Sequence, residues 1–335
     1  MQKIKRGPRV TWLVPQRNWT RILKPWTSSH WHPEYALASV WIRSYQLAPY
    51  LVQKGYDVRC NVLDPLPEVA IFLRRYSEKD VLLAKRLKRL GVRIIVDVVT
   101  HYFSPRENTN VSHFLRLIDL ADQVWCVSPF LQEISARYHP NTFFVSDSVD
   151  PIHFSLRPRV LSTSDFPINI GWSGVAPKAL FFLWLTPVLT PLIERGKIHL
   201  LIISSEPPDL PFPFEFRRWR YSKFPMDISD CKLCIAPRTL NNEYDKSHSL
   251  FKIGVFMAIG VPALASAVPS YNLLLGDGKG GTICESLEQW EYQLSRFIAT
   301  PSLREEWHQQ AQEKMQPFLT PNIAEQINHL LELIS

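Results

Sequence analysis

Short apolar runs alternate with amphipathic stretches along almost the whole of this 335-residue chain. A strand of a parallel sheet is buried on both faces and is followed by a crossover helix, so this alternation is typical of α/β proteins. In the first half it predicts strands at residues 9–14, 57–62, 69–74, 93–99, 123–127 and 143–146. The second half repeats it, with predicted strands at residues 168–173, 198–204, 215–221, 231–236, 262–266 and 281–284. The sequence therefore predicts two doubly wound parallel sheets.

Amphipathic stretches predict helices between these strands, including residues 36–54, 78–90, 249–259, 287–299 and 302–316. The segment 149–166 interrupts the pattern, because it contains prolines, no glycine and no clear hydrophobic period. We therefore predict an N-terminal domain at 1–150, a linker at 151–166 and a C-terminal domain at 167–316. The last residues, 317–335, are predicted to form a helix that packs back on the N-terminal domain.

The positive charge is concentrated in the first half of the chain. Residues 1–150 contain 21 Lys and Arg against 13 Asp and Glu, a net charge of +8. Residues 151–335 contain 17 against 18, a net charge of −1. A basic domain beside a neutral one indicates an anionic partner: a membrane surface, a phosphorylated substrate or nucleic acid. Part of the excess lies on the predicted helix 78–90, whose polar face carries lysines and arginines and is more often simply solvated.

Several function classes lose support from missing motifs. The first predicted strand is not followed by G-x-G-x-x-G, and neither a P-loop nor a G-x-S-x-G elbow occurs in the sequence. The five cysteines form no disulfide framework, and Cys231 and Cys234 are interpreted as buried thiols of a strand. We expect no secretory leader and no membrane span, because the apolar stretch 179–193 is short and contains two prolines.

The segment 245–266 has the most informative pattern for chemistry. Ser249 is predicted to cap a helix whose first-turn N–H groups can receive an anion. Lys252 follows in that first turn, where a cation is unfavourable for the helix dipole unless an anion such as a diphosphate binds nearby. Gly260 is predicted to end the helix at its C′ position.

These residues resemble the donor region of a known enzyme family. The run from Ser249 and Lys252 through Phe256–Pro262 to Ser266 is similar to the donor site of GT-B glycosyltransferases, in particular the retaining group one, family-four-like members. Other segments agree in order, including 170–174, 87–97 and 39–43, so the resemblance covers about 36–316. It implies a GT-B fold with two Rossmann-like domains facing a cleft. It also implies sugar transfer from a nucleotide-sugar donor.

The resemblance assigns donor-binding roles in the C-terminal domain. Lys252 would neutralise the diphosphate, which stabilises the leaving group electrostatically. Ser249, Ser173 and the backbone near Gly174 would bind the same group through hydrogen bonds. Trp219 lies where the base usually stacks in the family, and a place in the core is equally consistent with its sequence. No metal and no cofactor beyond the nucleotide sugar are expected.

Two residues of the N-terminal domain complete the predicted catalytic set with Lys252. Arg43, in the first helix of that domain, would reach a phosphate of the donor; a solvated helix charge is the alternative reading. His101 follows the strand that ends near Asp97 and would contact a sugar hydroxyl; a structural histidine is the alternative. The loop 18–35, rich in aromatic and basic residues, would bind the acceptor or simply pack.

The chain departs from the family at two positions. Val255 and Ser247 stand where the paired glutamates are usual, so the alternative is a catalytically silent GT-B-like binding or partner subunit. The acceptor is expected to be a glycan or a lipid-linked intermediate of surface polysaccharide or glycoconjugate synthesis. A cytoplasmic place, peripheral at the inner face of an anionic membrane, fits the basic half better than nucleic acid does.

Overall fold

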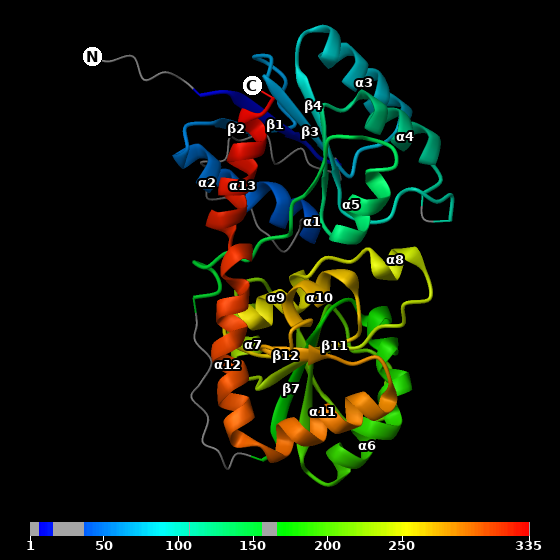
Figure 1. Cartoon of the computed structure of the whole chain (residues 1–335), viewed down its shortest axis with the longest axis vertical. Coiled ribbons are helices and arrows are strands. Elements are labelled where there is room, and N and C mark those ends of the chain that lie inside the picture. Colours follow the sequence, from blue (N-terminus) through cyan, green and yellow to red (C-terminus); the bar gives the residue numbers. More distant parts are fainter. Residues whose placement is uncertain (1–6, 16–36, 107, 156–165, 335) are drawn as a thin grey trace, which may run out of the picture. The chain divides into compact units, whose positions relative to one another are not determined.

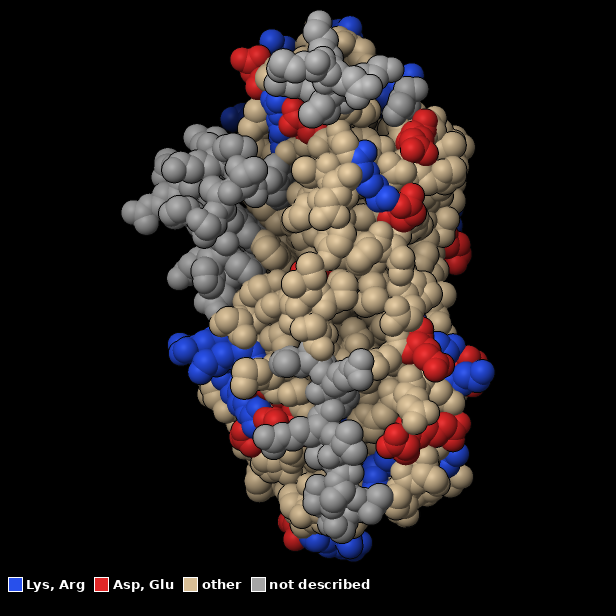
Figure 2. All heavy atoms as spheres, turned by 90° about the vertical axis from the view of Figure 1, so that its left-hand side faces the viewer, with Lys and Arg blue, Asp and Glu red and all other residues tan. Residues whose placement is uncertain are grey.

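The computed structural model describes residues 7–15, 37–106, 108–155 and 166–334. The chain divides into two compact units, which are described separately (Figure 1). Unit 1 contains Met1–Ser148, Ser247–Ser249 and Thr320–Ser335; unit 2 contains Val149–Lys246 and Leu250–Leu319. Figure 2 shows one face of the molecule, on which acidic and basic side chains are interspersed rather than gathered into one large patch of a single sign.

Unit 1 is built around a six-stranded parallel sheet in the order β2-β1-β3-β4-β5-β6. Its strands are β1 (Arg9–Leu13), β2 (Asp57–Cys60), β3 (Val69–Leu73), β4 (Arg93–Val98), β5 (Gln123–Cys126) and β6 (Thr142–Phe144). Its helices are α1 (Ala38–Val40), η2 (Trp41–Tyr45), α2 (Ala48–Gln53), α3 (Glu78–Arg89), α4 (Val111–Leu120), α5 (Pro129–Ser135) and α13 (Thr320–Glu332). These six strands confirm the sheet predicted for the first half.

Both faces of this sheet are covered, as a parallel sheet requires. Along β4, the alternate residues Ile94, Val96 and Val98 pack in one apolar cluster with α3 and α4, which lie side by side (Figure 1). Helix α13 packs against α2, and the Gln123 side chain of β5 donates a hydrogen bond to the Leu330 carbonyl of α13 at 2.8 Å. The last helix of the chain is thus part of unit 1.

The single helix predicted at 36–54 is instead three pieces. A π-helical turn, η2, separates α1 from α2, and α2 begins at Ala48 with Pro49 in its first turn. Proline has no backbone N–H to donate to the preceding turn, so the helix restarts there rather than continuing. The break places Arg43 and Ser44 inside unit 1, where both side chains are buried.

Arg43 forms a buried ion pair that ties η2 to the sheet. Its guanidinium donates hydrogen bonds to both oxygens of Asp97, the shortest at 2.7 Å, and to the Val145 carbonyl at 2.9 Å. Asp147 accepts a further bond at 3.2 Å. Burial lowers the pKa of Arg43, but the Asp97 and Asp147 carboxylates outweigh it and the pKa is raised overall. Arg43 was predicted to reach a donor phosphate; its guanidinium is occupied inside unit 1, which gives it a structural role.

Unit 2 is built around a second six-stranded parallel sheet, in the order β12-β11-β10-β7-β8-β9. Its strands are β7 (Ile168–Ser173), β8 (Ile198–Ser204), β9 (Glu215–Arg218), β10 (Leu233–Ala236), β11 (Ala263–Ala265) and β12 (Gly281–Ile283). Its helices are η3 (Ala176–Leu185), α6 (Thr186–Glu194), α7 (Phe224–Ser229), α8 (Glu243–Lys246), α9 (Phe251–Ala258), α10 (Pro269–Leu275), α11 (Leu287–Ala299), α12 (Pro301–Met315) and η4 (Gln316–Phe318).

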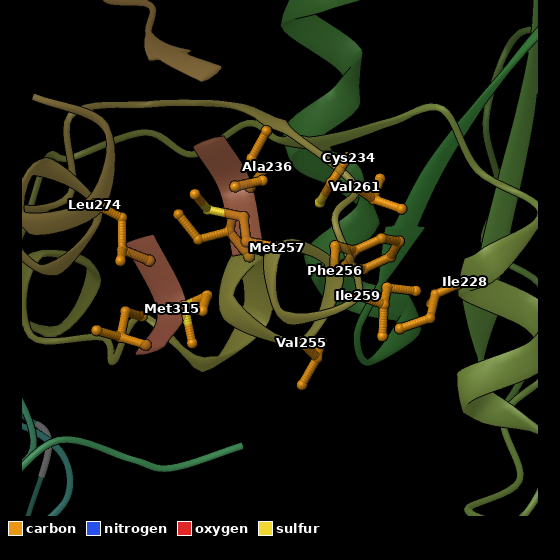
Figure 3. Close-up of a cluster of buried hydrophobic side chains, with 14 of the residues drawn as sticks. Ile228, Cys234, Ala236, Val255, Phe256, Met257, Ile259, Val261, Leu274 and Met315 are labelled. Carbon is orange, nitrogen blue, oxygen red and sulfur yellow. The ribbon is translucent and has the colours of Figure 1, made fainter. Parts of the chain in front are cut away.

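Alternate residues of the unit 2 strands enter two different cores. In β8, Leu200 and Ile202 pack with η3, α6 and α11, whereas Leu201 and Ile203 pack with α7, α9 and α12. The second core is drawn in Figure 3, where apolar side chains of α9 and the neighbouring strands lie together. The continuous apolar runs of the sequence are therefore strands that are buried on both sides.

One helical stretch among the described residues, Ala176–Glu194, is long and apolar enough to cross a membrane by length and composition. It is longer than the apolar stretch 179–193 on which the sequence prediction rested. Its buried residues Ala179, Phe182, Leu185 and Leu189 belong to a core of unit 2. Only 33% of its most apolar window is buried in this way, and Leu180 and Leu183 have 49% and 48% of their surfaces exposed.

The buried pair in unit 1 predicts a large stability difference. Replacing Arg43 by Gln leaves the Asp97 carboxylate buried without its partner, which costs about 3–5 kcal/mol of the free energy of unfolding. Replacing Arg59, whose pair with Asp57 is partly exposed, costs about 0–1 kcal/mol. Urea denaturation of R43Q and R59Q measures both. Equal losses in the two variants would contradict a structural role for Arg43, and R43M/D97L is expected to recover part of the loss.

Candidate anion-binding site of unit 2

The strand order of unit 2 creates a switch point between β7 and β10. From β7 the chain proceeds outward through β8 and β9, and it then returns to the other side of β7 with β10. The segments that follow β7 and β10 therefore diverge and leave room beyond the carboxyl ends of these two strands. In open α/β sheets, ligands bind at this place.

Three cationic side chains gather at this edge. Lys178 follows β7, Arg238 follows β10, and Lys252 lies in the first turn of α9. They are close enough that Arg238 and Lys178 each contribute to lowering the pKa of Lys252, and Arg238 contributes to lowering the pKa of Lys178. Like charges repel at short distance, so an anion bound among them would stabilise this arrangement.

Lys252 is held against an aromatic ring. Its Nζ lies 4.4 Å from the centre of the Trp172 ring, and within the described residues it makes no hydrogen bond or ion pair. Burial, followed by the charges of Arg238 and Lys178, lowers the pKa of Lys252 to about 7. The ammonium group therefore has free hydrogen-bonding capacity, and its charge responds to the surroundings near neutral pH.

Arg238 is fixed more firmly than the two lysines. Its backbone N–H donates to Ser266 Oγ at 2.8 Å, and its guanidinium donates to Asp245 Oδ1 at 2.7 Å while lying over the Phe181 ring. Asp245 is a carboxylate that acts on both Lys178 and Arg238. Lys252 lies nearby, and the charges of Arg238 and Lys178 lower its pKa.

Lys178 is positioned by an aromatic residue of helix α8, which also carries Asp245. Its Nζ donates a hydrogen bond to the Tyr244 hydroxyl at 3.2 Å and lies 5.1 Å from the centre of that ring. Burial, followed by the charge of Arg238, lowers the pKa of Lys178 to about 8, and Asp245 acts in the opposite direction. Lys178 and Lys252 thus share the same cause for their weakened basicity.

Gly174 provides close backbone access beside these cations. An added Cβ atom at Gly174 would lie 2.9 Å from Lys252 Nζ and 2.8 Å from the Trp172 ring, so glycine is required for this packing. The Gly174 N–H donates to the Ile203 carbonyl at 3.1 Å. The prediction named the backbone near Gly174, and this particular N–H is already used at the sheet edge. Ser173, the last residue of β7, is half-buried beside it.

Helix α9 ends as predicted but begins later. Gly260 has φ +88°, its N–H donates to Met257, and the Val261 N–H donates to Phe256, which together form a Schellman cap. The helix begins at Phe251 with Leu250 at the N-cap and no side-chain cap bond. The prediction that Ser249 caps the helix is therefore wrong, and Ser249 belongs to unit 1 whereas Lys252 belongs to unit 2.

The other predicted site residues lie in different surroundings. Trp219 is half-buried and rests on a core of unit 2, with its ring centre 6.2 Å from that of Phe224. His101, in unit 1, has 2% of its surface exposed and lies beside the Phe103 ring. Val255 is 2% exposed within the apolar cluster of Figure 3, and Ser247 is fully buried. The loop 18–35 lies outside the described residues.

Sequence reasoning found Lys252 but missed Lys178 and Arg238. Lys178 ends the triplet APK and Arg238 ends the triplet APR, each within a few residues of the end of a predicted strand. This position after a strand is the only sequence feature that could have indicated a role in binding. Their importance follows from the strand order, which brings two segments 60 residues apart to one edge of the sheet. No group of three or more metal-binding side chains occurs among the described residues.

This chain is similar to known proteins in its structure and not detectably in its sequence. No protein-family model and no curated protein sequence matches this chain. Sucrose-phosphate synthase from Thermosynechococcus elongatus matches with a TM-score of 0.69 at 12% identity, over 98% of this chain and 99% of that one. HepE from Anabaena, solved in complex with UDP and glucose, matches with a TM-score of 0.66 at 13% identity, over 98% and 100%.

A glycosyltransferase from Rickettsia africae also matches, with a TM-score of 0.62 at 11% identity, over 98% of both chains. At these identities the likeness concerns the fold. The predicted fold class is confirmed: the chain has the GT-B glycosyltransferase fold, with two six-stranded parallel sheets surrounded by helices.

Proposed function

We propose that this protein is a glycosyltransferase that binds a nucleotide sugar through its diphosphate at the cation cluster of unit 2. The observation that carries the proposal is the convergence of Lys178, Arg238 and Lys252 at the switch point, where each lysine has its pKa lowered by burial and by the neighbouring cations. A bound diphosphate would offset the repulsion among these cations. The HepE structures, which contain UDP, UDP and glucose, or UDP-glucose, make UDP the first nucleotide to test.

In this proposal the cations stabilise the departing nucleoside diphosphate. Sugar transfer places growing negative charge on the diphosphate oxygens, and fixed cations in a partly buried site stabilise that charge most strongly in the transition state. Arg238, held by Asp245 and Ser266, would position the diphosphate, and Lys252 and Lys178 would supply the adjustable charge. This chemistry requires no metal, and a retaining course is proposed from the family resemblance.

The acceptor side of the proposal rests on unit 1. We propose a glycan or lipid-linked acceptor of surface polysaccharide or glycoconjugate synthesis, reached by a cytoplasmic protein at the inner face of the membrane. The net charge of +8 in residues 1–150 supports an anionic surface or an acceptor that carries phosphate. His101 is kept as the proposed sugar contact of unit 1, although its small exposed fraction would limit that contact.

A catalytically silent GT-B-like subunit is the second candidate, and Val255 supports it. The side chain at this position lies in an apolar core, where the family's carboxylate would hold the ribose or the sugar. Two measurements distinguish an active glycosyltransferase from a silent subunit. One is the release of UDP from UDP-glucose, and the other is the binding of UDP, measured by calorimetry. Binding without release, over a panel of UDP-, GDP- and ADP-linked sugars, identifies the silent subunit.

Lys252→Ala is expected to weaken binding of UDP by roughly 10- to 100-fold, because it removes a charge-assisted hydrogen bond to the diphosphate. Isothermal titration calorimetry measures the affinity directly. Lys279→Ala removes the same charge from an exposed loop of unit 2 and is the matched control. Equal affinity of K252A and wild type would remove Lys252 from the donor site.

UDP binding is also expected to take up protons at pH 8. The pKa of Lys252 is about 7 in the empty site, so most of this group is neutral at pH 8, and a bound diphosphate raises the pKa. Uptake of about one proton at pH 8, falling toward pH 6 where the lysine is already charged, follows from linkage.

Calorimetry in buffers with different enthalpies of ionisation counts these protons. K252M should lose most of the uptake at pH 8, with Lys178 accounting for the remainder. Unchanged uptake in K252M would assign the proton to another group.

A further inference from the structure

Each of the three cations at the switch point of unit 2 lies over an aromatic ring. The three pairs, given with the distance from the charged group to the ring centre, are Lys252 over Trp172 at 4.4 Å, Lys178 over Tyr244 at 5.1 Å, and Arg238 over Phe181 at 5.1 Å. The rings come from three separate elements, β7, η3 and α8. Three elements thus each supply a ring to a different member of one group of cations.

The Trp172 ring is the main support of Lys252. Among the described residues, the Lys252 ammonium makes no hydrogen bond or ion pair, and burial is the largest cause of its lowered pKa. An indole ring attracts an ammonium group more strongly than a phenol or phenyl ring does. Trp172 is itself fixed, because it is 1% exposed in a core of unit 2, and Phe182 packs edge-on against it with ring centres 5.9 Å apart. The ring is therefore a rigid surface for the cation.

Gly174 keeps free the space that this contact needs. An added Cβ atom would lie 2.8 Å from the Trp172 ring and 2.9 Å from Lys252 Nζ, so a larger residue would push the ammonium away from the ring. The φ angle of Gly174 is not positive, unlike that of Gly260. The contact between Lys252 and Trp172, and not an unusual backbone conformation, therefore explains the glycine.

We propose that Trp172 is a positioning residue of the donor site proposed above, which holds the Lys252 ammonium over its face and in place for the diphosphate. Tyr244 has the same role toward Lys178. A ring lowers the cost of burying a cation without neutralising it, whereas a carboxylate would cancel the charge that the phosphate groups need. The rings thus keep two lysines that repel each other together in the empty site, so that the charges are preorganised for an anion.

The first test measures the pKa of Lys252 in the empty protein. The ionisable groups that act on Lys252 are Arg238, Lys178 and Cys234. W172L leaves all of them in place and should lower the pKa of Lys252 by roughly one unit, because a desolvated cation–π contact has an energy of that size. NMR titration of the full chain labelled with 13C-lysine follows this group, whose signal is assigned by its loss in K252M. W290L removes another buried tryptophan of the same core and should leave this pKa unchanged.

The second test measures the affinity for UDP at two pH values, which separates positioning from a general loss of structure. With a lower pKa, fewer Lys252 side chains are charged at pH 8, so W172L should bind UDP roughly 10-fold more weakly there. At pH 5.5 the lysine is charged in both proteins, and W172L should bind nearly as well as wild type. W172F, which keeps a ring, should recover part of the loss, and W290L should show the same ratio to wild type at both pH values.

Tyr244 provides an independent pair of variants if W172L does not fold. Y244F keeps a ring over Lys178, whereas Y244L removes it, and neither has the hydroxyl group. The pKa of Lys178 should therefore be lower in Y244L than in Y244F.

Equal pKa values of Lys252 in wild type and W172L, or of Lys178 in Y244F and Y244L, would overturn the proposal. An equal fall in the pKa of Lys252 in W290L would do the same, because it would assign the effect to the core as a whole. The NMR titration needs no nucleotide. Lysine pKa values that respond to the rings in a protein that does not bind UDP would therefore count against the proposed donor site and not against the role of the rings.

Discussion

The requirement that a parallel sheet be covered on both faces determines where this protein can carry a site. Each strand must be followed by a connection, in most cases a helix, that returns to the start of the sheet, so all the carboxyl ends of the strands lie at one edge. In unit 2 this brings together Gly174 after β7, Arg238 after β10 and Ser266 after β11. The core also reaches this edge directly, because buried Trp172 provides the ring over which Lys252 lies. The same packing that buries the strands thus positions the cations.

Charge balance distinguishes the two buried groups of ions. In unit 1 one arginine meets two carboxylates and its hydrogen bonds are satisfied, which is what a structural ion pair requires. In unit 2 Asp245 pairs with Arg238, while burial, followed by the neighbouring cations, lowers the pKa of Lys178 to about 8 and that of Lys252 to about 7. The first arrangement stabilises the folded state by itself. The second contains repulsion between cations, which a bound anion would reduce, and this is why we propose it as a binding site.

The sequence predicted the sheets well because burial on both faces produces a strong local signal. The bounds predicted for β7 and β8 are those of the structure, since most residues of both strands are buried and only a few polar residues interrupt them. Predictions from local sequence features were wrong or incomplete where the role of a residue depends on partners that are distant in the sequence. Arg43 looked like a free cation because its partner Asp97 is 54 positions away. Lys178 and Arg238 had no recognisable motif, since only the strand order places them beside Lys252. The late start of α9, at Phe251, shows that a good capping residue such as Ser249 does not by itself fix a helix end.

Val255 connects the packing of unit 2 with its proposed chemistry. This residue is 2% exposed within an apolar cluster, and an ionised carboxylate in such a place would lose its hydration without gaining a partner. The core at this position is therefore matched to valine, and Val255 cannot make the ribose or sugar contact that the family resemblance implies for a glutamate. If the proposed donor binding is correct, recognition depends mainly on the diphosphate. A site of that kind would discriminate by charge more strongly than by the identity of the sugar, because Lys178, Arg238 and Lys252 are all proposed to contact the phosphate groups.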